Sequence, residues 1–306
     1  MRVVLAFLAL FALETGCASA TCVGRRGPCT AQEKLAYGGR TRTYRVHLPS
    51  SHDPHKPQPA MVVLHGRLGT GVGMEKLAHF DEAAEKQGFV LIEPDGVRRS
   101  WADARGTTPA SRLGVDDLGF LTALIDELPQ RFAVDPKAIA VAGMSNGAFT
   151  ATTLACARAQ EISAVALVAG GFSDASLKSC APSKPLSVLM IHGDADPFVP
   201  SAGGELNGRG VAVGAREALE HWAALDGCTK TEPSVALADN SPDDGTTSMR
   251  EGRAGCREGA RVELVTVENG GHTWPGGWQY LPARFVGRTS RDFSATDLIA
   301  AFVAGK

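Results

Sequence analysis

Short apolar runs alternate with longer segments of helical periodicity along most of the chain. Residues 41–48 alternate between polar and apolar side chains, which is typical of a strand with one solvated face. The runs at 61–64 and 89–92 are apolar throughout, as expected of strands buried on both faces of a parallel sheet. The same patterns predict further strands at 138–142, 164–168, 187–191 and 262–267, and helices at 74–87, 116–132, 146–158, 213–225 and 294–303.

This alternation of strand and helix predicts the fold class. Repeated strand–helix units with short connections give a mostly parallel sheet that is covered by helices on both faces. We therefore expect an α/β fold whose ligand site lies beyond the carboxyl ends of the strands. No internal repeat or low-complexity linker interrupts the pattern, so residues 21–306 are expected to form a single catalytic domain.

Composition excludes several other classes of protein. The 306 residues carry 31 Lys and Arg against 33 Asp and Glu, a formal charge of −2, and their positive side chains are scattered along the sequence. Such a charge offers no field that would attract a polyanion, so no nucleic-acid partner is expected. A hydrophobic fraction of 44% argues against disorder, and no apolar run is long enough to span a bilayer.

The first 20 residues have the layout of a secretory signal. A positive residue, Arg2, precedes an apolar run at 3–13, and small residues end at Ala20 in an Ala-x-Ala pattern. Cys17 offers an alternative, a lipoprotein signal with an acylated cysteine, although Glu14 stands where an apolar residue is expected. Only in that case would the protein be attached to a membrane. Both interpretations predict a secreted or periplasmic protein.

The cysteines agree with export. Apart from Cys17 the set is even, and cysteines of exported proteins usually form disulfides. We expect no metal site, because the chain has no CxxC spacing and no histidine at zinc-ligand distance. The sequence leaves the pairing open, with one pair as free buried thiols an alternative, but short separations favour Cys22–Cys29, Cys156–Cys180 and Cys228–Cys256.

Residues 143–147 have the sequence GMSNG, which fits the pattern GxSxG. The pattern is weak in a chain with 35 glycines, but here it follows a predicted strand and precedes a predicted helix. In that context the serine lies on a sharp strand-to-helix turn, and Gly143 and Gly147 leave room for the chain to fold back. Ser145 is therefore the candidate nucleophile.

A serine hydroxyl needs a base, and the base needs an acid that orients it. His272 lies in a glycine-rich loop after the strand at 262–267, whereas His221 lies in a helical segment and His192 precedes the candidate acids. Asp196 is preferred to Asp194 as the acid, because Pro197 keeps it out of helical geometry. A metal site made by His192 and both aspartates is a weaker alternative.

Several sequence blocks together resemble the secreted polyhydroxybutyrate depolymerase and feruloyl esterase-like branch of the α/β-hydrolases. They span most of the chain after residue 20. The blocks are LHGRLGTG at 64–71, PDG at 94–96, SWADARG at 100–106, GVDDLGFL at 114–121, AGMSNGA at 142–148, HGDADPFVP at 192–200 and GGHTWPGG at 270–277.

The resemblance implies an α/β-hydrolase fold, a cofactor-free carboxylic ester hydrolase and the triad Ser145, Asp196 and His272. It also implies an oxyanion hole formed by the backbone N–H groups of Arg67 and Asn146. Arg67 departs from the family pattern, in which a small residue or cysteine is expected, so the role of its side chain is open.

Two tryptophans are candidate walls of an acyl site, since aromatic faces bind flat or apolar groups. Trp101 follows the strand that ends near Glu93, and Trp274 lies beside His272. Core positions for both are the alternative. Asp116 and Asp117 are interpreted as structural residues at a helix start.

The expected substrate is a small-molecule or oligomeric ester, either a hydroxycinnamoyl ester of plant polysaccharide or a 3-hydroxybutyrate polyester. No linker or added module follows the last predicted helix, which favours soluble esters. The alternatives are a serine peptidase or acyltransferase on the same fold, or a binding protein on a hydrolase scaffold that has lost activity.

Overall fold

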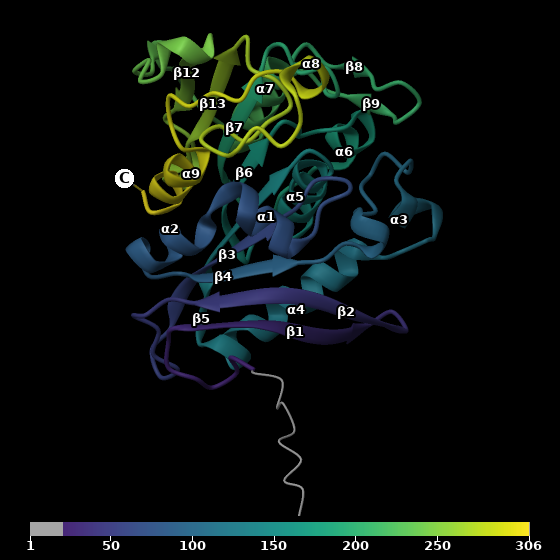
Figure 1. The fold of residues 1–306 in the computed structure, drawn as a ribbon, viewed down its shortest axis with the longest axis vertical. Coiled ribbons are helices and arrows are strands. Elements are labelled where there is room, and N and C mark those ends of the chain that lie inside the picture. The colour runs from purple at the N-terminus through teal and green to yellow at the C-terminus, as the bar shows by residue number, and fades with distance from the viewer. Residues whose placement is uncertain (1–20, 306) are drawn as a thin grey trace, which may run out of the picture.

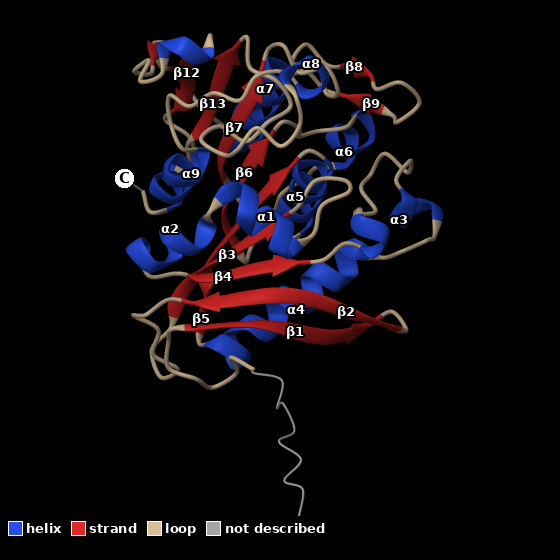
Figure 2. Ribbon diagram, viewed as in Figure 1, coloured by secondary structure: helices blue, strands red, loops and turns tan. Residues whose placement is uncertain are grey.

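The computed structural model describes residues 21–305. Its main sheet has the strand order β1-β2-β4-β3-β5-β6-β7-β13-β12-β10, with β11 paired to β12 (Figure 1, Figure 2). Strands β4, β3, β5, β6, β7 and β13 are parallel, whereas β1 and β2 at one edge and β12 at the other pair antiparallel. The predicted α/β class and mostly parallel sheet are confirmed.

The strands of the described chain are β1 (Cys29–Tyr37), β2 (Arg40–Leu48), β3 (Gln58–Leu64), β4 (Val90–Pro94), β5 (Val134–Met144), β6 (Ile162–Val168), β7 (Ser187–Gly193), β8 (Gly204–Glu205), β9 (Val211–Ala212), β10 (Lys230–Thr231), β11 (Val235–Ala236), β12 (Thr247–Ala254) and β13 (Val262–Glu268). The α-helices are α1 (Gly71–Ala78), α2 (Phe80–Gln87), α3 (Pro109–Arg112), α4 (Asp117–Phe132), α5 (Asn146–Ala157), α6 (Asp174–Ser179), α7 (Ala215–Asp226), α8 (Ala283–Val286) and α9 (Ala295–Val303).

Two hydrophobic cores cover the two faces of the sheet. Helices α4, α5 and α7 pack on one face, and α1, α2 and α9 pack on the other. Neighbouring residues of one strand contribute to opposite cores: in β3, Val62 belongs to the first core, while Met61 and Val63 belong to the second. This double burial explains why the central strands are apolar throughout instead of alternating.

Among the elements that differ from the sequence prediction, two do so for identifiable reasons. The helix expected at 74–87 is broken at His79, whose left-handed φ of 55° separates α1 from α2. Strand β1 was missed because its inward positions include Glu33, which interrupts the apolar alternation. Glu33 is buried and accepts hydrogen bonds from the backbone of Cys22 and the guanidinium of Arg131.

Three disulfides form in the pairing favoured from the sequence: Cys22–Cys29, Cys156–Cys180 and Cys228–Cys256. The second joins the end of α5 to the end of α6. The predicted signal at 1–20 and Cys17 lie outside the described residues. Within 21–305, no helix is both long and apolar enough to cross a bilayer.

Candidate active site

Ser145 stands on a sharp turn between β5 and α5. Its φ of 54° and ψ of −118° are values that residues other than glycine rarely adopt, and such strain concentrates at functional sites. A Cβ at Gly143 would overlap the backbone of Gly147, and a Cβ at Gly147 would overlap the carbonyl of Leu64. The GxSxG spacing is therefore required by the close approach of α5 to β3 and β5.

The strand ends around this turn are held in register by backbone hydrogen bonds that continue beyond the strands. Because these bonds connect β5 to β6, β6 to β7 and β7 to β13, loops from distant parts of the chain meet at one edge of the sheet. The bonds run from Ser145 N to Val168 O at 2.8 Å, from Ala169 N to Ile191 O at 3.0 Å, and from Asp194 N to Val267 O at 3.0 Å.

The structure brings Asp196 and His272 together at this edge. The Nδ1 of His272 lies 2.6 Å from Oδ2 of Asp196, and both side chains are buried. The other oxygen of Asp196 accepts hydrogen bonds from the backbone N–H groups of Phe198 and Val199 at 2.8 and 2.9 Å. The carboxylate is thus fixed by its own loop, and its bond to Nδ1 leaves Nε2 of His272 as the basic nitrogen.

Asp194 has a different position. Its Oδ1 accepts a hydrogen bond from the backbone N–H of Asn269 at 2.7 Å, so it fastens the loop that leads to His272. Ser145 is partly exposed, and within residues 21–305 no hydrogen bond joins its hydroxyl to His272. Such contacts are often long in ligand-free enzymes and shorten when substrate binds.

His192 supports the loop of Asp196. Its Nε2 lies 2.8 Å from the carbonyl oxygen of Val199 and 3.7 Å from Oδ2 of Asp196. Burial lowers the pKa of His192, which favours the neutral imidazole with Nε2–H as donor. The residue therefore holds the 196–199 turn.

The loop after β3, which carries the predicted oxyanion donor Arg67, is oriented by His65, a residue that sequence reasoning did not single out. The backbone N–H of Gly96 donates to Nε2 of His65 at 2.9 Å, so Nδ1 carries the proton and donates to the carbonyl of Gly66 at 2.7 Å. Burial lowers the pKa of His65, in agreement with this neutral form. Because a trans peptide points its C=O and N–H in opposite directions, fixing the Gly66 carbonyl also fixes the N–H of Arg67.

Both predicted oxyanion donors lie next to the nucleophile. A Cβ built on Gly66 would lie 3.5 Å from the Cβ of Ser145, so the N–H of Arg67 belongs to the peptide group beside the serine. Asn146 follows Ser145 directly and begins α5, where backbone N–H groups have no partner within the helix. In the described chain neither N–H has an acceptor, so both are available to a developing oxyanion.

Trp101 joins the two segments that carry the predicted oxyanion donors Arg67 and Asn146. Its backbone N–H donates to Oδ1 of Asn146 at 2.8 Å, and its indole N–H donates to the carbonyl of His65 at 2.9 Å. The side-chain amide of Asn146 also donates to Asp103 at 2.7 Å. Asp117 accepts from the N–H of Ala102 and pairs with Arg42, so it is structural as predicted.

The expectation that the two tryptophans form walls of an acyl site is corrected by their burial. Trp101 has no exposed surface, and Trp274 is 1% exposed. The indole of Trp274 donates to Thr296 in α9 and packs edge-on against Phe80 of α2. Neither ring offers a face to a ligand, because tertiary packing covers both.

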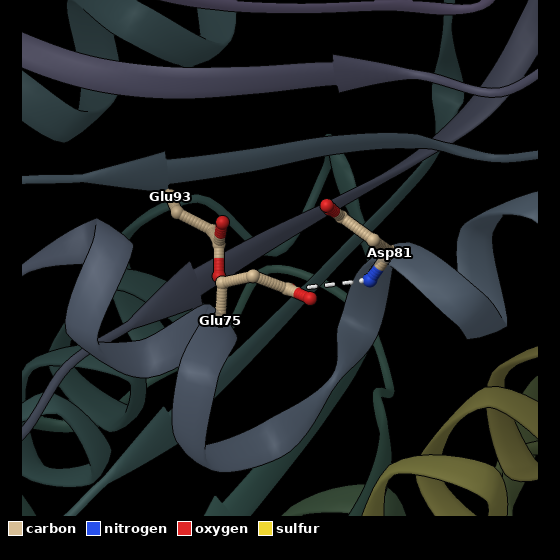
Figure 3. A group of neighbouring side chains, drawn as sticks. All are labelled: Glu75, Asp81 and Glu93. Atoms are coloured by element: carbon tan, nitrogen blue, oxygen red, sulfur yellow. Dashed lines mark hydrogen bonds between the residues drawn. The ribbon is translucent and has the colours of Figure 1, made fainter.

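A cluster of three carboxylates is formed by Glu75 of α1, Asp81 of α2 and Glu93 of β4 (Figure 3). Glu75 accepts a hydrogen bond from the backbone N–H of Asp81, while the guanidinium of Arg45 bonds to Asp81 and to Glu93. Burial raises the pKa of Glu93 to about 8. The guanidinium thus supplies the positive charge that a metal ion would otherwise bring.

Comparison with known proteins agrees with this geometry. The model of a family described as "Putative esterase" matches residues 36–246. "Putative esterase NocK" of Nocardia uniformis subsp. tsuyamanensis is 32% identical over 288 residues, covering 90% of this chain and 83% of that protein. "Feruloyl esterase B" of Piromyces equi is 28% identical, covering 74% of this chain but only 42% of the fungal protein.

Among solved structures, the acetyl xylan esterase from Aspergillus awamori superposes with a TM-score of 0.56 at 15% identity. The match covers 79% of this chain and 94% of that one. At such low identity the similarity concerns the fold, and it is the α/β-hydrolase fold that the sequence blocks implied.

The role of Trp101 can be tested by Trp101→Phe, with Trp222→Phe as the matched control. Both indoles are fully buried, but in the described chain the N–H of Trp222 has no partner. Loss of the bond to His65 should lower the free energy of unfolding by about 1–3 kcal/mol more than the control does. It should also lower kcat/KM by the same factor for acetyl and aromatic esters. A loss of kcat/KM confined to aromatic esters would instead show that Trp101 contacts the acyl group, as a wall of the acyl site would.

Proposed function

Because the chain belongs to the family described as "Putative esterase" and is a carboxylic ester hydrolase, we propose that it works through an acyl-enzyme on Ser145. The observation that carries the proposal is the buried pair of His272 and Asp196, 2.6 Å apart, at the sheet edge where Ser145 is held in a strained turn. His272 is the base, and Asp196 orients it.

The proposal assigns a residue to each step of the reaction. As Oγ of Ser145 attacks the ester carbonyl carbon, its proton passes to Nε2 of His272, and the carbonyl oxygen becomes an oxyanion bound by the N–H groups of Arg67 and Asn146. The tetrahedral intermediate collapses when the C–O bond breaks and His272 protonates the leaving alcohol. Water then repeats the sequence on the acyl-serine and releases the acid.

For the substrate we propose soluble esters with an aromatic acyl group such as feruloyl, with short hydroxyacyl esters as the second candidate. Two fungal feruloyl esterases, from Piromyces equi and Emericella nidulans, are 28% and 29% identical to the matched parts of this chain. With Trp101 and Trp274 buried, two other aromatic side chains are candidates for contact with the acyl group: Phe198, which is half-buried and packs edge-on against the ring of His272, and Trp278, which is 57% exposed. The segment of Trp278 contacts the base, since Tyr280 donates its hydroxyl to the carbonyl of His272.

The three disulfides also support a site of action outside the cytoplasm, because such bonds persist in oxidising compartments. We propose that residues 1–20 direct this export.

The mechanism predicts that Ser145→Ala lowers kcat/KM for p-nitrophenyl acetate at least ~1000-fold, because the attacking hydroxyl is removed. Asp196→Asn should lower it at least ~100-fold, since the amide cannot hold His272 in the productive tautomer. Asp194→Asn is the matched control and should lower it less than ~10-fold, because Asp194 bonds to backbone. Equal losses in the two aspartate variants would contradict the assignment. Cleavage of peptide anilides, or net transfer of the acyl group to alcohols, would favour the alternative functions.

The substrate proposal predicts a higher kcat/KM for methyl ferulate than for the methyl ester of a soluble 3-hydroxybutyrate oligomer, a comparison in which neither substrate carries a carboxylate. Trp278→Ala should lower the ferulate value about fivefold more than the value for p-nitrophenyl acetate, because an aromatic contact is lost. Val235→Ala, which shortens a side chain that is 58% exposed on the outer strand β11, is the control. A preference for the oligomer, or equal effects on both esters, would overturn the aromatic assignment.

A further inference from the structure

Three arginines that are separated in sequence meet at the rim of the candidate site. Arg67 lies in the oxyanion loop after β3, and Arg98 and Arg99 lie in the short 3-10 helix Val97–Arg99 after β4. The backbone N–H of Leu68 donates to the carbonyl of Arg99 at 2.7 Å, which joins the two loops. We refer to Arg67, Arg98 and Arg99 as the arginine rim.

The charges of the arginine rim are not neutralised by the protein. All three side chains are exposed, and in the described chain none of the guanidinium groups forms an ion pair or a hydrogen bond. The nearest carboxylates are already engaged. Asp95 accepts from the N–H of Gly71 and the hydroxyl of Thr43. Asp103 binds Arg105 and the amide of Asn146.

The backbone of the rim is strained where its side chains project. Arg98 and Arg99 have φ values of 54° and 55°. Leu68, which follows Arg67 and binds the carbonyl of Arg99, has a φ of 68°. Glycine or asparagine would adopt these conformations at lower cost, so arginine is retained here against a local preference. Strain of this kind is found most often at functional sites, so the arginine rim is a candidate for such a site.

The rim is also close to the reacting atoms. The N–H of Arg67 is a candidate oxyanion donor, and Gly66 approaches the Cβ of Ser145. The loop of Arg98 and Arg99 continues directly into Ser100 and Trp101, which binds Asn146. A substrate whose ester carbonyl lies at Ser145 therefore lies next to the two loops that carry these unpaired arginines, and guanidinium binds carboxylate through paired hydrogen bonds.

We propose that the arginine rim recognises an anionic group of the substrate, so that this enzyme prefers esters that also carry a carboxylate. The inference rests on the proposed function, because it concerns the substrate of the same site. It also gives a role to the side chain of Arg67, which departs from the family pattern.

Two pairs of esters test the inference. Mono-p-nitrophenyl adipate and p-nitrophenyl hexanoate differ by a carboxylate on the acyl side, and 4-carboxyphenyl acetate and 4-carbamoylphenyl acetate differ by one on the alcohol side. The measured quantity is the ratio of kcat/KM for the anionic ester to that for the neutral ester. A change in the oxyanion loop itself affects both esters and cancels in this ratio.

In at least one pair the wild-type ratio should fall as ionic strength rises from about 0.01 to about 1 M, which shortens the Debye length from about 30 to about 3 Å. Each of Arg67→Gln, Arg98→Gln and Arg99→Gln should lower that ratio about threefold, and the triple variant about 30-fold. Glutamine keeps an unbranched side chain at the strained positions while it removes the charge.

Arg25→Gln is the control, because Arg25 is an exposed arginine in the loop closed by Cys22–Cys29. Cys29 pairs with Leu48, and the adjacent His47 pairs with Leu91 near the start of β4, so this loop lies at the opposite edge of the sheet from Ser145. The control should leave both ratios unchanged.

If the enzyme hydrolyses the neutral esters while the rim variants keep the wild-type ratios in both pairs, the inference is overturned and the proposed function stands. A ratio that falls equally in Arg25→Gln also overturns it, because net charge would then be the cause. If no ester of either pair is hydrolysed, the proposed function fails with it.

Discussion

The left-handed backbone of Ser145 is the constraint on which the rest of the site depends. The sharp turn, with a φ of 54°, brings the strand before it and the helix after it almost into contact, and the missing Cβ atoms of Gly143 and Gly147 allow that approach. The turn places the hydroxyl above the carboxyl edge of the sheet. It also directs the first amide of α5 toward the same space, so the proposed nucleophile and one proposed oxyanion donor come from one local conformation.

A buried polar network then fixes the loop of Arg67, one proposed oxyanion donor, relative to Asn146, the other. The carbonyl of His65 accepts a hydrogen bond from the indole of Trp101, and the side chain of His65 binds Gly66 and Gly96. The backbone N–H and C=O of Trp101 both bind the side-chain amide of Asn146. Buried polar groups that are all satisfied make a rigid arrangement, because breaking one bond leaves another group unpaired in a low dielectric. Such rigidity is what electrostatic stabilisation of an oxyanion requires, since its donors are then oriented before the reaction begins.

Local features of the sequence predicted much of this arrangement. The central strands, the strand–serine–helix context of Ser145 and the loops of Asp196 and His272 could be placed because each depends on a few adjacent residues. The burial of Trp101 and Trp274 could not, since it depends on contacts with His65 and Thr296 from distant segments. Both tryptophans stand beside catalytic motifs, which made a ligand contact as reasonable as a core position.

The grouping of the arginine rim could not be predicted from local sequence either. Arg67 is separated from Arg98 and Arg99 by about thirty residues, and along the sequence the positive charges look scattered. The bond between Leu68 and Arg99 brings them together. Likewise, the edge strand β1 could not be predicted, because Glu33 interrupts its apolar pattern. The partner that makes the burial of Glu33 tolerable, Arg131, lies in α4. Contacts between residues that are distant in the sequence determine where such side chains lie, and local periodicity gives no information about these contacts.

Covalent labelling tests the central claim most directly. A fluorophosphonate reacts with a serine hydroxyl in proportion to its activation, so the rate of labelling reports the base as well as the nucleophile. We predict a single adduct that peptide mass spectrometry assigns to Ser145, formed at least ~100-fold more slowly in His272→Ala. An adduct on another residue, or a labelling rate at Ser145 that does not change when His272 is replaced, would contradict the account.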